Sequence, residues 1–243
     1  MASVTEFSIV VPTHGRPASL RRLVESLAGL RYPRDNYEAI IVIDGGPNPL
    51  EGLDWPFRLR ILRQDNLGPA AARNHGARAA EGRYLVFTDD DCVPDAGWLA
   101  EFERAIHSDP DSLCGGRTVN MYPGSLPTEA SQLLSDFLFE NCDPAVRMGG
   151  FFPSNNMSVD RLRFLEMGGF DERLRFGEDR EMCSRWRARG HSFGSAPLAI
   201  VRHGHLQDLP AFLRLHFRYG SGTSRFRRTV REKGLPRPGF SSP

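Results

Sequence analysis

The chain has 243 residues, of which 40% are hydrophobic and 25% charged, and its formal net charge is +1. These values are ordinary for a soluble globular protein, and the near-neutral charge argues against a nucleic-acid binder. The charge is unevenly spread, because residues 202–237 carry nine basic side chains against two acidic ones. A basic segment on an otherwise acidic body indicates an anionic partner, such as a diphosphate or a membrane surface.

The cysteine pattern and the hydropathy indicate the compartment. The four cysteines, at positions 92, 114, 142 and 183, form no CxxC or Cys/His cluster, which argues against a zinc site and favours reduced thiols. The first residues show neither a basic nor an apolar signal region, and no apolar run approaches the roughly 18 residues that span a bilayer. We therefore expect a cytoplasmic, soluble protein.

The first half of the chain alternates apolar runs with helical patterns. Buried strands are predicted at residues 7–12, 39–43, 58–62 and 84–88. Helices are predicted at residues 17–30, 69–81 and 98–106. This alternation predicts an α/β fold with an open, mostly parallel, Rossmann-like sheet and helices on both faces. In such sheets ligands bind beyond the carboxyl ends of the strands.

The second half is less regular. Extended segments are predicted at residues 113–121, 151–159 and 196–201. Helices are predicted at 129–139, at 179–189 before Gly190, and at 208–219, where the pattern is amphipathic. A tail rich in glycine, serine and arginine follows, and we expect it to be flexible.

Three acidic residues, Asp89, Asp90 and Asp91, directly follow the predicted strand at 84–88. Adjacent carboxylates repel one another unless a cation or solvent compensates their charge. Alternate residues of an extended segment face the same way, so Asp89 and Asp91 can converge on one divalent ion. Oxygen ligands favour Mg²⁺ or Mn²⁺ over zinc. The alternative is a solvated acidic loop.

These residues belong to a series of motifs that resembles the family 2 glycosyltransferases, which have the GT-A fold. The motifs, in order, are Phe7–Thr13 with Arg16, then Asp44, Asn66-Leu67-Gly68, Ala72-Arg73-Asn74 with Gly76, Ala80-Glu81-Gly82, Asp89–Asp91, Asn155–Ser158, Gly168–Glu172 and Phe176–Asp179. The resemblance covers about residues 7–220. It implies residues 1–205 as the GT-A domain, with 1–112 as the nucleotide-sugar-binding half, 113–205 as the acceptor side and 206–243 as a C-terminal helix and tail.

The resemblance implies roles for individual side chains on the donor side. Contacts to the nucleotide sugar are expected from Pro12, Thr13, Arg16, Asp44, Asn66, Arg73, Asp89 and Asp90. Asp91, with Asp89 and His203, is expected to hold Mn²⁺ or Mg²⁺. His14-Gly15 and Asp44-Gly45-Gly46 depart from the pairs common in the family, so the base stays open, with a UDP-sugar favoured. The alternatives are a surface helix around Arg73 and a histidine without a role at position 203.

Transfer to an acceptor hydroxyl requires a base, because the hydroxyl must lose its proton during attack. Glu178 and Asp179 open the predicted helix and are the candidate catalytic pair, with Asp179 as the base of an inverting reaction. Their alternative role is to stabilise the start of the helix. Residues 221–237 are interpreted as a lid over the diphosphate, with Arg225 and Arg228 as contacts, or otherwise as a disordered basic end.

Two other functions remain open at this stage. A sugar-phosphate nucleotidyltransferase shares the fold and metal use, but residues 12–17 do not form its glycine-rich phosphate loop. A non-catalytic sugar-nucleotide-binding or scaffold protein would have a damaged metal or base motif, whereas both motifs are intact here. An oxidoreductase is excluded because G-x-G-x-x-G is absent after the first strand. The sequence leaves the acceptor and the oligomeric state undefined.

Overall fold

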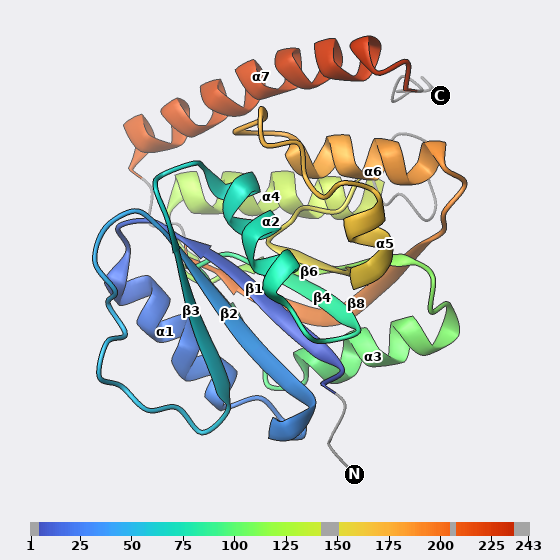
Figure 1. Ribbon diagram of the computed structural model, residues 1–243. Helices are drawn as coiled ribbons and strands as arrows, with labels where there is room; N and C mark the ends of the chain where they lie inside the picture. Colours follow the sequence, from blue (N-terminus) through green and yellow to red (C-terminus); the bar gives the residue numbers. More distant parts are fainter. Residues whose placement is uncertain (1–4, 142–150, 205–207, 236–243) are drawn as a thin grey trace.

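The computed structural model describes residues 5–141, 151–204 and 208–235 (Figure 1). In these ranges eight strands form one sheet, in the order β3-β2-β1-β4-β7-β6-β8-β5. Their bounds are β1 Phe7–Thr13, β2 Tyr37–Asp44, β3 Arg58–Gln64, β4 Tyr84–Thr88, β5 Cys92–Pro94, β6 Leu113–Asn120, β7 Asn156–Asp160 and β8 Phe193–His203. Only β5 and β7 run against the other six, so the predicted mostly parallel sheet is confirmed.

The helices cover both faces of this sheet, as predicted (Figure 1). Their bounds are α1 Pro17–Ala28, α2 Pro69–Ala79, α3 Trp98–Ser108, α4 Leu126–Asn141, α5 Arg161–Glu166, α6 Glu178–Ala188 and α7 Leu209–Glu232, and a 3-10 turn η1 spans Arg34–Asn36. Alternate residues of β1 serve the two faces: Ile9 and Val11 join the core under α1 and α3, whereas Val10 joins the core under α2, α5 and α6. No described helix is long and apolar enough to cross a membrane.

The carboxyl ends of the parallel strands lie together at one edge of the sheet. Thr13 at the end of β1 lies opposite Ile43 of β2, so the residues after both strands emerge side by side. The antiparallel strand β7 begins at the same edge, because Asn156 pairs with Thr88 at the end of β4. The acidic triplet after β4 therefore lies next to the segment that leads into β7.

Gly76 allows helix α2 to pack directly against β1 of the sheet. A Cβ atom at this position would come 2.5 Å from Cγ1 of Val10, a distance that no side chain can occupy. The neighbouring alanines of α2 are also buried. This close packing brings Arg73, one turn earlier on the same helix, to the edge of the sheet where the strands end.

The C-terminal helix differs most from the sequence-based prediction. The amphipathic helix predicted to end at residue 219 continues without a break to Glu232, so most of the predicted flexible tail is helical. Gly222, Phe226 and Val230 form a buried stripe with a spacing of four residues, which holds this part of α7 against the protein. Asp208 caps the first turn by accepting the backbone N–H of Ala211 at 2.7 Å. Packing of this stripe outweighs the glycine- and serine-rich composition.

Three smaller features were not predicted. Strand β5 has only three residues and α5 only six, which is too short for a recognisable pattern. Strand β8 is longer than expected, since it spans Phe193–His203. Of the cysteines, Cys92, Cys114 and Cys183 are buried free thiols, whereas Cys142 lies outside the described residues.

Candidate functional site

A cleft of about 630 Å³ lies at the edge where the strands end. One side is formed by residues that follow β1, β2 and β4, and the other by residues from α4, α6, α7 and the segment before β7. Of the residues predicted for the site, the cleft brings together Pro12, Thr13, Arg16, Asp44, Arg73, Asp89, Asp90, Asp91, Glu178, Asp179 and His203. They come from positions up to 191 residues apart in the sequence.

Asp90 is held by two neighbours at and just after the end of β1. The hydroxyl of Thr13 donates to its carboxylate at 2.7 Å, and Arg16 donates to the other oxygen at 3.1 Å. Burial raises the pKa of Asp90 to about 6, against the effect of Arg16. The same guanidinium also pairs with Asp91. Arg16 therefore compensates charge on two carboxylates of the acidic triplet.

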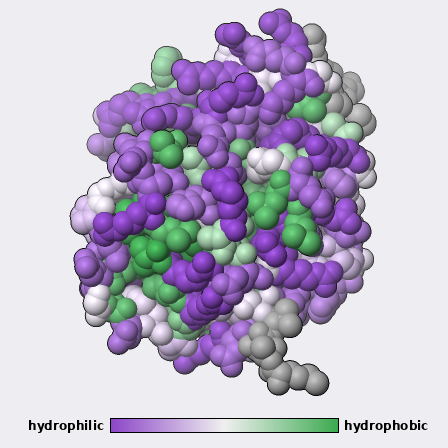
Figure 2. All heavy atoms as spheres, in the orientation of Figure 1, coloured by the Kyte–Doolittle hydropathy of each residue, from purple (hydrophilic) through white to green (hydrophobic). Residues whose placement is uncertain are grey.

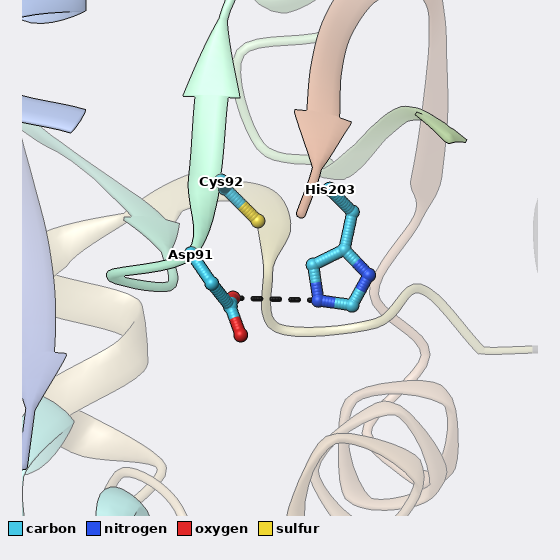
Figure 3. A group of neighbouring side chains, drawn as sticks. All are labelled: Asp91, Cys92 and His203. Carbon is cyan, nitrogen blue, oxygen red and sulfur yellow. Dashed lines mark ion pairs between the residues drawn. The ribbon is translucent and has the colours of Figure 1, made fainter. Parts of the chain in front are cut away.

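Asp91, Cys92 and His203 form a cluster whose potential ligand atoms lie within 4.8 Å of one another (Figure 3). Nε2 of His203 is 3.3 Å from Oδ1 of Asp91. Pairing of Cys92 with His203 between β5 and β8 brings these distant positions together. Burial raises the pKa of the Cys92 thiol well above its usual value, so its sulfur stays protonated. A carboxylate and an imidazole remain, and the carboxylate oxygen is of the ligand type that Mn²⁺ and Mg²⁺ prefer.

Asp89 does not join this cluster in the structure. Its carboxylate instead accepts a hydrogen bond from Nη2 of Arg73 at 2.5 Å, while Nη1 of Arg73 donates to Glu178 at 2.9 Å. The side chain of Arg73 is only 4% exposed, so these two carboxylates compensate a buried charge. Arg73 therefore links the acidic triplet after β4 to the start of α6, and the alternative of a plain surface helix does not hold for this residue.

Glu178 and Asp179 begin α6, directly after Gly177, which adopts the left-handed conformation with φ of 83°. Burial and the neighbouring Asp179 raise the pKa of Glu178 to about 7, although Arg73 acts in the opposite direction. Burial also raises the pKa of Asp179, whose carboxylate accepts the backbone N–H of Arg180 at 2.7 Å. Two carboxyl groups with raised pKa values thus face the cleft from one helix start.

Asp44 already has three hydrogen-bond donors from this chain. Its Oδ1 accepts from the side chain of Gln64 at 2.8 Å and from the backbone of Leu67 at 2.7 Å, and its Oδ2 accepts from Gly68 at 2.9 Å. These bonds fix the turn that precedes α2. A carboxylate has about four acceptor positions, so these three bonds leave one position of Asp44, a residue that lines the cleft.

Three predicted contacts do not line the cleft. Asn66 lies in the turn held by Asp44, with φ of 29°, and is exposed. Arg225 and Arg228 lie on the exposed side of α7, where Arg228 pairs with Glu232 at 2.8 Å. Neither arginine lines the cleft in this structure, and their role in a lid over the donor stays a prediction.

Several cleft residues were not predicted from the sequence. The opposite face of α7 contributes Leu215, His216 and Tyr219, and α4 contributes Ser131 and Gln132. No motif marks these positions. The sequence predicts that these residues lie on helices, but it does not show that these helix faces line the cleft.

The fold that surrounds this cleft is the GT-A fold, as two solved structures show. The mannosyltransferase PcManGT from Pyrobaculum calidifontis, in complex with GDP-Man and Mn²⁺, matches with a TM-score of 0.71 at 17% identity, covering 93% of this chain and 64% of that one. TarS 1-349 from S. aureus, in complex with UDP-GlcNAc, matches with a TM-score of 0.65 at 17% identity, covering 86% and 60%.

The sequence comparisons define the family. Residues 8–165 match the model of Glycosyl transferase family 2, and the chain belongs to this family. The pre-mycofactocin glycosyltransferase of Mycobacterium tuberculosis (strain CDC 1551 / Oshkosh) is 29% identical over 231 residues, which cover 90% of this chain and 47% of the relative. Glycosyltransferase AglE of Haloferax volcanii is 25% identical, with 91% and 74% covered. The chain thus spans about half the length of the mycobacterial relative. The predicted family is confirmed.

Proposed function

We propose that this chain is a metal-dependent, inverting glycosyltransferase that moves a sugar from a nucleoside-diphosphate donor to an acceptor hydroxyl. One observation carries the proposal: Asp91, His203 and Asp179 line a single cleft, and Arg73 in the same cleft binds both Asp89 and Glu178. Related folds bind GDP-Man with Mn²⁺ in one protein and UDP-GlcNAc in another. A UDP-sugar is the first donor to test, because one acceptor position of Asp44 can receive the N–H of a uracil.

On the donor side, Asp91 and His203 would hold the divalent ion. When bound, such an ion neutralises the charge that develops on the departing diphosphate. Arg16 forms ion pairs with Asp90 and Asp91, and its side chain is half exposed at the cleft. A flexible guanidinium at this place can exchange a carboxylate for a phosphate oxygen, because both are bound with the same geometry. We infer that Arg16 turns toward the diphosphate when donor and metal bind.

On the acceptor side, Asp179 is the better base of the two carboxylates. Glu178 is committed to the buried ion pair with Arg73, whereas within the described residues Asp179 has no arginine or lysine at ion-pair distance. Its raised pKa makes it a stronger proton acceptor than an ordinary aspartate. The hydroxyl proton would pass to Asp179 while the acceptor oxygen attacks the anomeric carbon and the diphosphate departs. One displacement of this kind inverts the configuration.

A panel of sugar nucleotides, with and without Mn²⁺, tests the proposal. The expected result is a metal-dependent rise in melting temperature with one or a few donors, since ligands that bind only the native state stabilise it. The same mixtures, analysed for products, separate the alternatives. Release of nucleoside diphosphate supports a transferase, whereas pyrophosphate formation indicates a nucleotidyltransferase. Binding without any product indicates a non-catalytic sugar-nucleotide protein.

A further inference from the structure

Helix α7 has two surfaces of different character. One side lines the cleft through Leu215 and Tyr219 and is buried further along through Phe226 and Val230. The other side faces solvent and begins with a stripe of large apolar residues. Its members, four residues apart, are Leu209, Leu213 and Phe217, which are 56%, 58% and 80% exposed. Nothing in the described residues covers this stripe, which we call the α7 apolar stripe.

The exposed surface of α7 is also strongly basic. The helix carries six arginines and one glutamate, a net charge of +5 in 24 residues. All six arginines are exposed: Arg214, Arg218, Arg225, Arg227, Arg228 and Arg231. Only Arg228 has an ion pair among the described residues. In Figure 2 the top of the molecule, where α7 lies in Figure 1, is accordingly mostly hydrophilic.

We propose that α7 docks the protein on an anionic bilayer. An in-plane membrane helix combines leucine and phenylalanine on one side with arginine or lysine beside them, so that apolar side chains enter the acyl boundary while the charges meet headgroups. The α7 apolar stripe and the flanking Arg214 and Arg218 provide this arrangement. A soluble polyanion would satisfy the arginines but would gain nothing from an exposed Phe217. The charge and the apolar stripe together therefore favour a lipid surface.

The docking also has a consequence for the cleft, and this step rests on the proposed function. Because the same helix lines the cleft through Leu215 and Tyr219, docking would place the cleft beside the bilayer. An acceptor hydroxyl carried on a lipid headgroup could then reach Asp179 without leaving the membrane surface. The acceptor class that fits this placement is a lipid-linked one.

Co-sedimentation of the full chain with vesicles tests the docking without any donor or metal. We expect binding to vesicles of phosphatidylglycerol and phosphatidylcholine, much weaker binding to pure phosphatidylcholine, and loss of binding as salt increases. Replacing both Leu213 and Phe217 by serine should weaken binding at least about ten-fold. Replacing Arg214 and Arg218 by glutamine should weaken it roughly five-fold for each arginine.

The matched control replaces Leu162 and Leu198 by serine, since these leucines are 59% and 61% exposed but lie on α5 and β8. This variant should bind vesicles like the wild type, and circular dichroism should show that all variants remain folded. Equal binding to both vesicle types would overturn the proposal. Sensitivity to the arginine changes alone would also overturn it, because the α7 apolar stripe would then contribute nothing to binding. The proposal would also be overturned if the wild type did not bind vesicles but formed a dimer that Leu213→Ser with Phe217→Ser made monomeric, because the stripe would then bind a second copy of the chain.

Donor hydrolysis of each variant separates this inference from the proposed function. Leu213 and Phe217 do not line the cleft, so the variant with Leu213→Ser and Phe217→Ser should release nucleoside diphosphate from a soluble donor at the wild-type rate. Vesicle binding with no hydrolysis by any variant would support docking and contradict the transferase. Hydrolysis without vesicle binding would contradict docking alone.

Discussion

The guanidinium of Arg73 lies 2.9 Å from the carboxylate of Glu178, and this ion pair ties α2, which packs on the parallel strands, to the start of α6. The pair is almost fully buried, with side-chain exposures of 4% and 9%. The second branch of the same guanidinium binds Asp89. The two sides of the cleft are therefore held at a fixed spacing by one arginine.

Removing this arginine should destabilise the protein strongly. Arg73→Gln leaves Asp89 and Glu178 without their counter-charge, and loss of one partner of a buried pair typically costs about 3–5 kcal/mol. Arg78→Gln on the same helix is the matched control, because its side chain is 60% exposed and pairs loosely with Glu172 at 3.9 Å. Its effect should stay within about 0.5 kcal/mol. Urea unfolding measures both variants, and equal effects would contradict a structural role for Arg73.

The raised pKa of Glu178 predicts how the stability of the ligand-free protein changes with pH. A carboxyl pKa of about 7 in the folded state exceeds the value in the unfolded chain, so the folded state holds the proton more tightly. The stabilising contribution is complete below the unfolded-state pKa and is lost as pH rises through about 7.

Glu178→Gln keeps the side chain neutral at every pH. Between pH 5 and pH 8 the unfolding free energy of this variant should therefore rise relative to the wild type, by about 1–3 kcal/mol. Urea unfolding at several pH values provides the comparison. A difference that does not change with pH would contradict the assignment of the raised pKa.

The continuous helix α7 predicts opposite effects of two glycine substitutions. A Cβ atom at Gly222 would come 2.6 Å from Cβ of Phe176, whereas at Gly220 it would meet no atom within 4 Å. Gly222→Ala should lower the unfolding free energy by about 1–3 kcal/mol and speed tryptic cleavage within α7, because the helix must shift. Gly220→Ala should be neutral or stabilise by up to about 1 kcal/mol. If both variants resist trypsin equally, the close contact is not required.

The parts of the fold that sequence reasoning predicted are those with local signals. Strand β4 is a continuous apolar run that ends at the acidic triplet, so both the strand and the site residues Asp89–Asp91 were predictable. The pairing of β5 with β8 was not, because three residues at 92–94 gain their structure from a strand more than a hundred positions later. The same long-range pairing places His203 beside Asp91, a contact that only the family resemblance suggested.

Helix α7 shows a different limit of the sequence. Its glycine, serine and arginine content is typical of a flexible tail. Within this composition, Phe226 and Val230 are the few apolar residues at helical spacing, and they are easily overlooked. The helix is held by contacts with the rest of the protein. Gly222 allows Phe176 to pack closely against α7, and Lys233 forms an ion pair with Asp171 at 2.8 Å. Such complementarity exists only in the folded protein, so the continuation of α7 to Glu232 could not be predicted from the sequence.

Metal binding should depend on Asp91 but not on Cys92. Mn²⁺ is expected to raise the melting temperature of the wild type, and Asp91→Asn should abolish this rise because the carboxylate that faces His203 is lost. Cys92→Ala should keep it, since the protonated thiol contributes nothing to a hard cation. Each shift is measured against the same variant without metal. A lost response in Cys92→Ala with a retained one in Asp91→Asn would contradict the assigned ligands.

The most direct test of the central claim is the rate of nucleoside-diphosphate release by wild type and Asp179→Asn, with acceptor and Mn²⁺ present at saturating donor. A positioned base contributes about 10²–10⁴-fold, so kcat should fall by this factor while donor affinity, measured by titration, stays nearly unchanged. Glu178→Gln is the neighbouring control and should retain more turnover. Near-normal turnover of Asp179→Asn, together with an inactive Glu178→Gln, would contradict Asp179 as the base.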